Sequence, residues 1–297
     1  MNIREITLAL GGGGAKGNAH IGVLRRLERE GFVIRAVAGT SFGGIVAALY
    51  AAGFTPDEIE AHFCRIDQSK LYGRAPGEGP SLLGLAGAKK FFEEVLGERT
   101  FADLRMPCAI TAVDVDRAQE VIFREGRVVD AVLATIALPG IFPPYQVGGR
   151  RLVDGGVLDP VPVTSARSLS PHLPVVAVVL TERLEEPVRI KISLSLPDYI
   201  PAPLVKRITH SRLAQAFDIF LRAVDISTRH MTELRLKVDR PDVILYPAVS
   251  GIGLLDQTDV PRVARLGERA VENAMPKLLR VTGWLNRLRL RLRRGVA

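Results

Sequence analysis

The sequence predicts an α/β fold with a mainly parallel central sheet flanked by helices. Short apolar runs alternate with helical patterns along the chain, as expected when parallel strands are joined by helices. Two glycine-rich turns, GGGGAKG at 11–17 and GTSFGG at 39–44, each follow an apolar run and precede a helical pattern. With 297 residues, of which 47% are hydrophobic, the chain can bury the core of one large domain.

The predicted elements begin with a strand before the first glycine turn and an amphipathic helix after it, which stops at Gly31. Strands are predicted at Ile6–Leu10, Val33–Ala38, Cys108–Val115, Glu120–Phe123, Arg151–Val153, Val175–Leu180 and Val243–Tyr246. Helical patterns fill most of the intervals between them.

Further helix and loop signals lie between these strands. A capping box from Thr55 to Glu58 starts one helix. From Pro203 onward the chain suits a long helix or a broken pair, and packing is its expected role. Segments 69–87 and 185–203 are rich in Gly or Pro, so we expect either mobile covers near a site or plain surface loops.

The first glycine turn is suited to bind negative charge, because it presents free N–H groups at the positive end of a helix dipole. A phosphate-binding P-loop is excluded, since Lys16 precedes the last glycine and Asn18 follows it. Gly12, Gly14 and Gly17 fit the dinucleotide pattern G-x-G-x-x-G, but the second strand ends without the required acidic residue. A dinucleotide-dependent oxidoreductase therefore stays an alternative, as does a turn that only serves helix packing.

The second glycine turn places Ser41 between Gly39 and Gly43, which is the G-x-S-x-G pattern of a nucleophile elbow at a strand-to-helix turn. A serine that merely caps the helix is the alternative. Because the carboxyl ends of adjacent parallel strands meet at one edge of a sheet, the first turn can supply an oxyanion hole for Ser41.

A histidine is the usual partner of a catalytic serine. The five histidines are His20, His62, His172, His210 and His230. The chain order of α/β-hydrolases would nominate one of the last three, yet none has a supporting neighbourhood, and only two strands fit before residue 41. A conventional triad is not favoured.

An aspartate is the other candidate base. Asp154 ends a short strand and precedes Gly155 and Gly156, where another loop can approach closely; an ordinary D-G-G turn is an equal alternative. Asp114 and Asp116 are typical of a hairpin turn, and two acids alone do not make a metal site.

Taken in order, the segments GGGGAKG, GTSFGG, ATIALPGIFPP and DGG resemble the motifs of the patatin-like phospholipase family. The resemblance covers Ile6–Leu180 and implies a three-layer patatin-like fold with a catalytic Ser41–Asp154 dyad, no histidine, no cofactor and no metal. It implies an oxyanion hole formed by Gly12, Gly13 and Gly14. The remaining motif residues are Gly17, Gly39, Gly43, Gly155 and Gly156. Lys16 and Thr135 stand where the family more often has Arg and Ser.

The implied chemistry makes one demand on the site. Aspartate has an ordinary pKa of about 3.9 and is a weak base toward a serine hydroxyl, so we expect a desolvated pocket that raises the pKa of Asp154. The expected reaction is hydrolysis of carboxylic esters of phospholipids or lysophospholipids. The alternatives are the dinucleotide-dependent oxidoreductase and a non-catalytic membrane-surface protein.

The expected organisation is a single catalytic domain at 1–280 with its motifs within 6–180, followed by a basic amphipathic tail at 281–297. The chain has a net charge of +8, and from residue 273 onward it carries seven basic residues and no acidic one. If the tail is helical, one face carries four apolar residues, Val281, Leu285, Leu288 and Leu292. Trp284 lies next to this face. This pattern is typical of an anchor on anionic membrane, with a solvated tail as the alternative.

Location and partners follow from composition. Cys64 and Cys108 are the two cysteines, the N-terminus lacks the pattern of a secretory signal, and no apolar run is long enough to cross a membrane. We therefore expect a cytoplasmic protein, peripheral at the inner face of the membrane if the tail binds lipid. Nucleic acid is not an expected partner, because aromatic residues are not interleaved with the basic ones.

Overall fold

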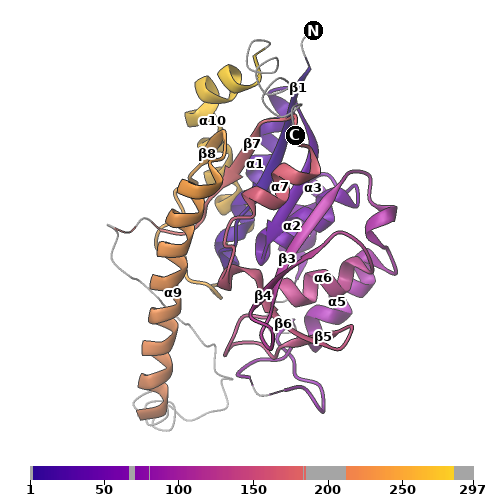
Figure 1. The fold of residues 1–297 in the computed structure, drawn as a ribbon, viewed down its shortest axis with the longest axis vertical. Coiled ribbons are helices and arrows are strands. Elements are labelled where there is room, and N and C mark those ends of the chain that lie inside the picture. The colour runs from indigo at the N-terminus through magenta and orange to yellow at the C-terminus, as the bar shows by residue number, and fades with distance from the viewer. Residues whose placement is uncertain (1–2, 67–70, 80, 183, 185–211, 284–297) are drawn as a thin grey trace.

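The computed structural model describes residues 3–66, 71–79, 81–182, 184 and 212–283 (Figure 1). These residues form one eight-stranded sheet in the order β5-β6-β3-β2-β1-β7-β8, with β4 paired to β3. The strands are β1 (Arg4–Leu10), β2 (Phe32–Thr40), β3 (Cys108–Asp114), β4 (Gln119–Phe123), β5 (Tyr145–Val147), β6 (Arg150–Asp154), β7 (Val175–Val178) and β8 (Val243–Leu245). The helices are α1 (Ala19–Arg29), α2 (Phe42–Ala51), α3 (Pro56–Arg65), α5 (Ala86–Leu96), α6 (Val128–Thr135), α7 (Val163–Leu169), α9 (Arg212–Asp239) and α10 (Val260–Val281).

The sheet is mainly parallel, as predicted. Strand β1 pairs in parallel with β2 and β7, β2 with β3, and β7 with β8. The antiparallel pairs lie at one end of the sheet, where β3 pairs with β4 and β6, and β5 pairs with β6. Helices connect the parallel strands, because two parallel strands cannot be joined by a tight turn.

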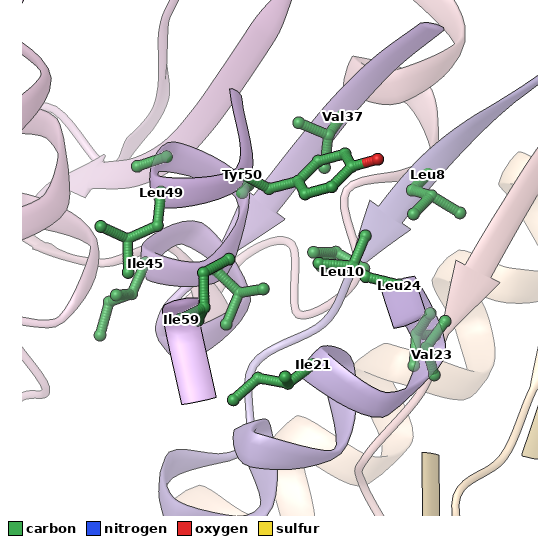
Figure 2. Packing of buried hydrophobic residues seen from close by; sticks show 14 of the residues in the cluster. Leu8, Leu10, Ile21, Val23, Leu24, Val37, Ile45, Leu49, Tyr50 and Ile59 are labelled. Atoms are coloured by element: carbon green, nitrogen blue, oxygen red, sulfur yellow. The ribbon is translucent and has the colours of Figure 1, made fainter. Parts of the chain in front are cut away.

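One face of the sheet carries large aliphatic side chains. Figure 2 shows Leu8 and Leu10 of β1 beside Ile21 and Leu24 of α1. These four side chains are fully buried, and they belong to the core cluster that also contains residues of α2, α3, α5, α6 and α10. Full burial of one such side chain contributes about 1.5–3 kcal/mol, so this face supplies most of the apolar stabilisation.

The other face carries alanines. Ala9, Ala38, Ala109 and Ala177 are direct cross-strand neighbours on β1, β2, β3 and β7, and all are fully buried. They pack with Val163 and other residues of α7, and with a residue of α9. Small side chains let these helices lie close to the sheet, so the fold has three layers.

The predicted strands are all present, each with ends within two residues of the prediction. Strand β5 was not predicted; it pairs with β6 across Gly148 and Gly149, which have φ values of +57° and +72°. The capping box is confirmed, since the Thr55 hydroxyl accepts the N–H of Glu58 at 3.2 Å.

The C-terminal half contains two long helices. Helix α9 lies along one side of the molecule, and its N-terminal half projects beyond the sheet (Figure 1). Helix α10 ends at Val281, whose side chain packs against the core rather than extending into a free tail. Residues 284–297 of the predicted tail and the segment 185–203 lie outside the described residues. None of the helices in the described ranges is long and apolar enough to cross a bilayer.

Candidate active site

Strand register brings the two predicted catalytic residues together, although they come from strands that are not neighbours. Thr40, the last residue of β2, pairs with Thr111 of β3. The next residue of β3, Ala112, pairs with Asp154 at the end of β6. Ser41 directly follows Thr40. It therefore lies at the same height along the strands as Asp154, and β3 lies between the two residues.

Ser41 occupies a sharp turn between β2 and α2 with φ +56° and ψ −128°. Such a conformation costs a non-glycine residue about 1–3 kcal/mol and persists only where surrounding contacts enforce it. A β-carbon on Gly39 would lie 2.3 Å from the Gly43 carbonyl oxygen, and one on Gly43 would lie 2.2 Å from that of Leu10. The Ser41 side chain makes no hydrogen bond to the start of α2, so it does not cap the helix.

Asp154 is buried at 3% exposure, and its carboxylate accepts a hydrogen bond from the Gly156 N–H at 2.7 Å. Burial raises the pKa of Asp154 to about 6, and its interactions with the Ser41 hydroxyl and the Gly156 N–H oppose that rise. The expected desolvation of Asp154 and the expected rise of its pKa are therefore both present. Gly155 is needed for close packing, since a β-carbon there would lie 2.3 Å from the Thr111 hydroxyl oxygen.

The glycine run after β1 is approached by three different parts of the chain. A β-carbon on Gly12 would lie 3.2 Å from Ser41 Cβ, and one on Gly13 would lie 2.9 Å from Leu180 Cβ. Gly14 has φ +56°, and a β-carbon there would lie 2.2 Å from the Leu254 carbonyl oxygen. Atoms of Ser41, Leu180 and Leu254 leave too little room for a β-carbon, which explains why these positions are glycines.

The N–H groups of this loop are not equivalent. The Gly12 N–H donates to the Pro160 carbonyl at 3.0 Å, and the Ala15 N–H donates to the Leu254 carbonyl at 2.9 Å. Among the described residues, the N–H groups of Gly13 and Gly14 have no acceptor. These two are the donors that remain for a ligand.

His20 of α1 holds the start of the same loop through a hydrogen bond to Gly11. Its Nε2 donates to the Gly11 carbonyl at 2.8 Å, and burial lowers its pKa to about 4, although this hydrogen bond opposes the shift. The ring is therefore neutral at ordinary pH and acts as a fixed donor. No short sequence pattern around His20 predicts this contact with Gly11.

A cavity of about 280 Å³ lies in front of Ser41 and Asp154. Its walls are mostly apolar, with aromatic residues of α2, α3 and α5; they include Phe42, Phe63, Phe91 and Phe92. Helix α9 contributes Leu221 and Val224. Packing was the expected role of this helix, and the structure adds a place in the wall of the cavity.

A chain of paired, partly buried charges lies along the polar side of the cavity. Lys16 Nζ lies 3.3 Å from Glu182, and Glu182 lies 2.6 Å from the Arg229 guanidinium. Arg229 also pairs with Asp225 at 2.7 Å. Burial alone would raise the pKa of Glu182, but Lys16 and Arg229 together lower it. Two cations and two anions balance, and Glu182 links the glycine loop to α9.

No histidine lines the cavity within the described part of the chain. His172 is exposed in the turn after α7, and His230 is exposed on α9; His210 lies outside the described residues. Of the two acids at the predicted hairpin turn, Asp114 pairs with Arg117 and Asp116 pairs with Arg151. Both are engaged in the turn between β3 and β4.

The three-layer α/β fold thus brings a serine elbow, a glycine loop and a buried aspartate together at one edge of the sheet. Residues 8–167 match the family model described as patatin-like phospholipase, which is more than half of the chain. The chain belongs to the patatin-like phospholipase family.

Relatives with curated descriptions agree with this assignment. An uncharacterised NTE family protein of Mycobacterium tuberculosis is 35% identical over 172 residues, which cover 57% of this chain and 47% of that protein. A second NTE family protein from the same species is 32% identical over 286 residues, which cover 93% of this chain and 48% of that protein. Lysophospholipase NTE1 of Saccharomyces cerevisiae is 27% identical over 175 residues, which cover 56% of this chain and 10% of the yeast protein. The chain thus spans about half the length of these mycobacterial relatives and a tenth of the yeast protein.

Proposed function

We propose that this protein is a serine lipid acyl hydrolase that cleaves carboxylic ester bonds of phospholipids or lysophospholipids. The observation that carries the proposal is that strand register brings Ser41 beside the buried carboxylate of Asp154, which interacts with the Ser41 hydroxyl and whose pKa is raised to about 6 by burial. An aspartate with that pKa is largely ionised at neutral pH and is a stronger base than an exposed one.

In the proposed reaction, Ser41 is the nucleophile, Asp154 the base, and the glycine loop the oxyanion hole. Ser41 Oγ attacks the ester carbonyl while Asp154 accepts its proton. The N–H groups of Gly13 and Gly14 stabilise the tetrahedral oxyanion, a contribution of about 2.7–4 kcal/mol per donor. Asp154 returns the proton to the leaving alcohol, and water then cleaves the acyl-enzyme. Gly12 lies against Ser41, but its N–H is already engaged, so its role is close packing.

The cavity favours a lipid as the substrate. Its aromatic and aliphatic walls suit an acyl chain, and its two cations, Lys16 and Arg229, are already paired with Glu182 and Asp225. One relative bears the name lysophospholipase. Phospholipids and lysophospholipids are therefore the first substrates to assay.

Membrane attachment belongs to the proposal on sequence grounds. The basic tail at 281–297 would hold the enzyme on anionic lipid at the inner face of the membrane, where its substrates lie. Val281 is already packed on the core, so the contact with lipid would begin after it.

Labelling with a fluorophosphonate probe, together with hydrolysis of a lipid panel, tests the proposal. Wild type and the exposed-site control Ser227→Ala should react with the probe and hydrolyse ester, whereas Ser41→Ala should do neither. His172→Ala and His230→Ala should keep their activity. Nucleotide binding without labelling would support the oxidoreductase, and a folded wild type with no labelling, turnover or nucleotide binding would leave a non-catalytic membrane-surface protein.

A further inference from the structure

The third family motif, ATIALPGIFPP at 134–144, supplies neither nucleophile nor base to the proposed mechanism. It begins at the end of α6, where Thr135 is fully buried and does not line the cavity. The Thr135 Oγ1 accepts the backbone N–H of Ser41 at 2.7 Å. A side chain that never meets the substrate therefore holds the backbone of the nucleophile.

The same short stretch also holds the backbone of the base. Two residues after Thr135, the Ala137 carbonyl accepts the N–H of Asp154 at 3.0 Å. Ser41 and Asp154 come from β2 and β6, which are separated in the sheet by β3. The end of α6 thus makes a direct link between two residues that the sheet connects only indirectly.

Packing fixes the orientation of the threonine. A β-carbon on Gly44 would lie 2.8 Å from Thr135 Cγ2, so the methyl group is seated against the first turn of α2. With its methyl group held there, the hydroxyl oxygen stays directed at the Ser41 N–H. Serine at this position would keep the oxygen but lose the seated methyl group.

We propose that Thr135 is a positioning residue for the reaction: it enforces the left-handed backbone of Ser41 and thereby aligns the Ser41 hydroxyl with the Asp154 carboxylate. The inference rests on the proposed function of that pair. Ser41 has φ +56°, and without an acceptor for its part-buried N–H this residue would relax toward ordinary helical or extended geometry. A small rotation there moves the nucleophilic oxygen away from both Asp154 and the substrate carbonyl.

The test compares Thr135→Val, which keeps the shape but removes the acceptor, with Thr135→Ser, which keeps the acceptor. The control Thr7→Val makes the same change at a fully buried hydroxyl with no hydrogen-bond partner among the described residues. With a soluble short-chain ester, Thr135→Val should lower kcat and the rate of fluorophosphonate labelling by about tenfold or more, with KM near the wild-type value. Thr135→Ser should keep most of the activity, and Thr7→Val should match wild type.

The pH profile separates positioning from a general loss of structure. The Ser41 hydroxyl lowers the pKa of Asp154, so loss of its alignment in Thr135→Val should move the acid limb of kcat/KM to higher pH. A general loosening of the site would instead hydrate the carboxylate and move the limb to lower pH. Wild-type kcat in folded Thr135→Val, or an equal loss in Thr135→Ser, would overturn the proposal. If Thr135→Val fails to fold, Thr135→Ala and Thr135→Ser provide the same comparison, because they differ only in the hydroxyl group. A wild type that neither labels nor hydrolyses ester would refute the proposed function itself.

Discussion

A β-carbon on Gly17 would lie 2.1 Å from Cδ1 of Phe42, so the last glycine of the first motif is in direct contact with the residue after the nucleophile. The Phe42 ring also packs on Phe63, with ring centroids 5.1 Å apart, and both residues line the cavity. The two glycine motifs are therefore joined by a packed side chain as well as by the sheet.

Gly17→Ala should displace the Phe42 ring, and overpacking of this kind costs about 1–3 kcal/mol of folding free energy. Hydrolysis should fall as well, because Phe42 is the residue after Ser41 and its displacement would shift the Ser41 backbone. Thermal or denaturant unfolding and ester turnover measure the two effects. The double variant Gly17→Ala with Phe42→Ala should cost less than the sum of the single variants, since the clash is gone. Strictly additive costs would show that the contact is not the cause.

The pH dependence of kcat/KM should show an acid limb with a midpoint near pH 6, because Asp154 must be ionised to accept the proton of Ser41. Activity should rise from pH 5 to pH 7 and then level off. A soluble ester assayed across this range measures the midpoint. A midpoint near pH 4 would mean that water reaches the carboxylate, and a limb lost in His172→Ala or His230→Ala would assign it to a histidine.

Asp154→Asn should abolish turnover while stabilising the protein at alkaline pH. The pKa of Asp154 is higher in the folded protein than in the unfolded chain, so the folded state holds the proton longer as the pH rises. Stability from this group is present at about pH 4 and is lost as the pH rises through about 6, on the order of 2–3 kcal/mol in total. Denaturant unfolding at pH 8 should therefore favour Asp154→Asn over wild type, and the gap should close toward pH 4. An equal gap at both pH values would argue against a buried charge.

Gly14→Ala and Gly31→Ala form a matched pair, because both glycines have positive φ, +56° and +76°. At Gly31 nothing lies within 4 Å of an added β-carbon, so the cost is the backbone strain of about 1–2 kcal/mol. At Gly14 the Leu254 carbonyl lies 2.2 Å away, so the loop must shift and carry its N–H groups with it. Turnover should collapse in Gly14→Ala and persist in Gly31→Ala. Equal activity of the two variants would remove the loop from the mechanism.

Removal of Trp284–Ala297 should lower sedimentation with anionic vesicles and hydrolysis of vesicle lipid, because each basic residue near the surface contributes about 1 kcal/mol. Hydrolysis of a soluble ester should stay near the wild-type rate. High salt should have the same effect as the deletion through screening. A parallel loss on both substrates would instead indicate a structural segment packed on the core.

The local features of this protein could be predicted from its sequence, because each rests on a short pattern. The β1 and β2 strands, the elbow at Ser41 and the acid at Asp154 each occupy a few consecutive residues with a recognisable spacing. Strand β5 was missed, although the Gly148–Gly149 pair between two short polar-flanked runs is a hairpin signal. Three residues are too few for a periodic pattern to be counted.

Features that depend on tertiary contact could not be predicted. That the Gly12 N–H donates to Pro160 depends on a turn about 150 residues away in sequence. Arg229 and Glu182 are ordinary charged residues in the sequence, and only the docking of α9 makes them part of the cavity wall. Thr135 stood within a recognised motif, yet its partner became evident only from the position of α6 over the elbow.

Helix α9, which forms part of the cavity wall, begins at residue 212, whereas the match to the family ends at residue 167. The proposed reacting groups thus lie within the matched residues, whereas part of the cavity wall is encoded after them, and Glu182 links the two stretches. Substitutions in the later stretch can reshape the space offered to a ligand without touching Ser41, Asp154 or the glycine loop. We therefore expect substitutions on the cavity side of α9 to change which substrates are accepted while the proposed chemistry of Ser41 and Asp154 is kept.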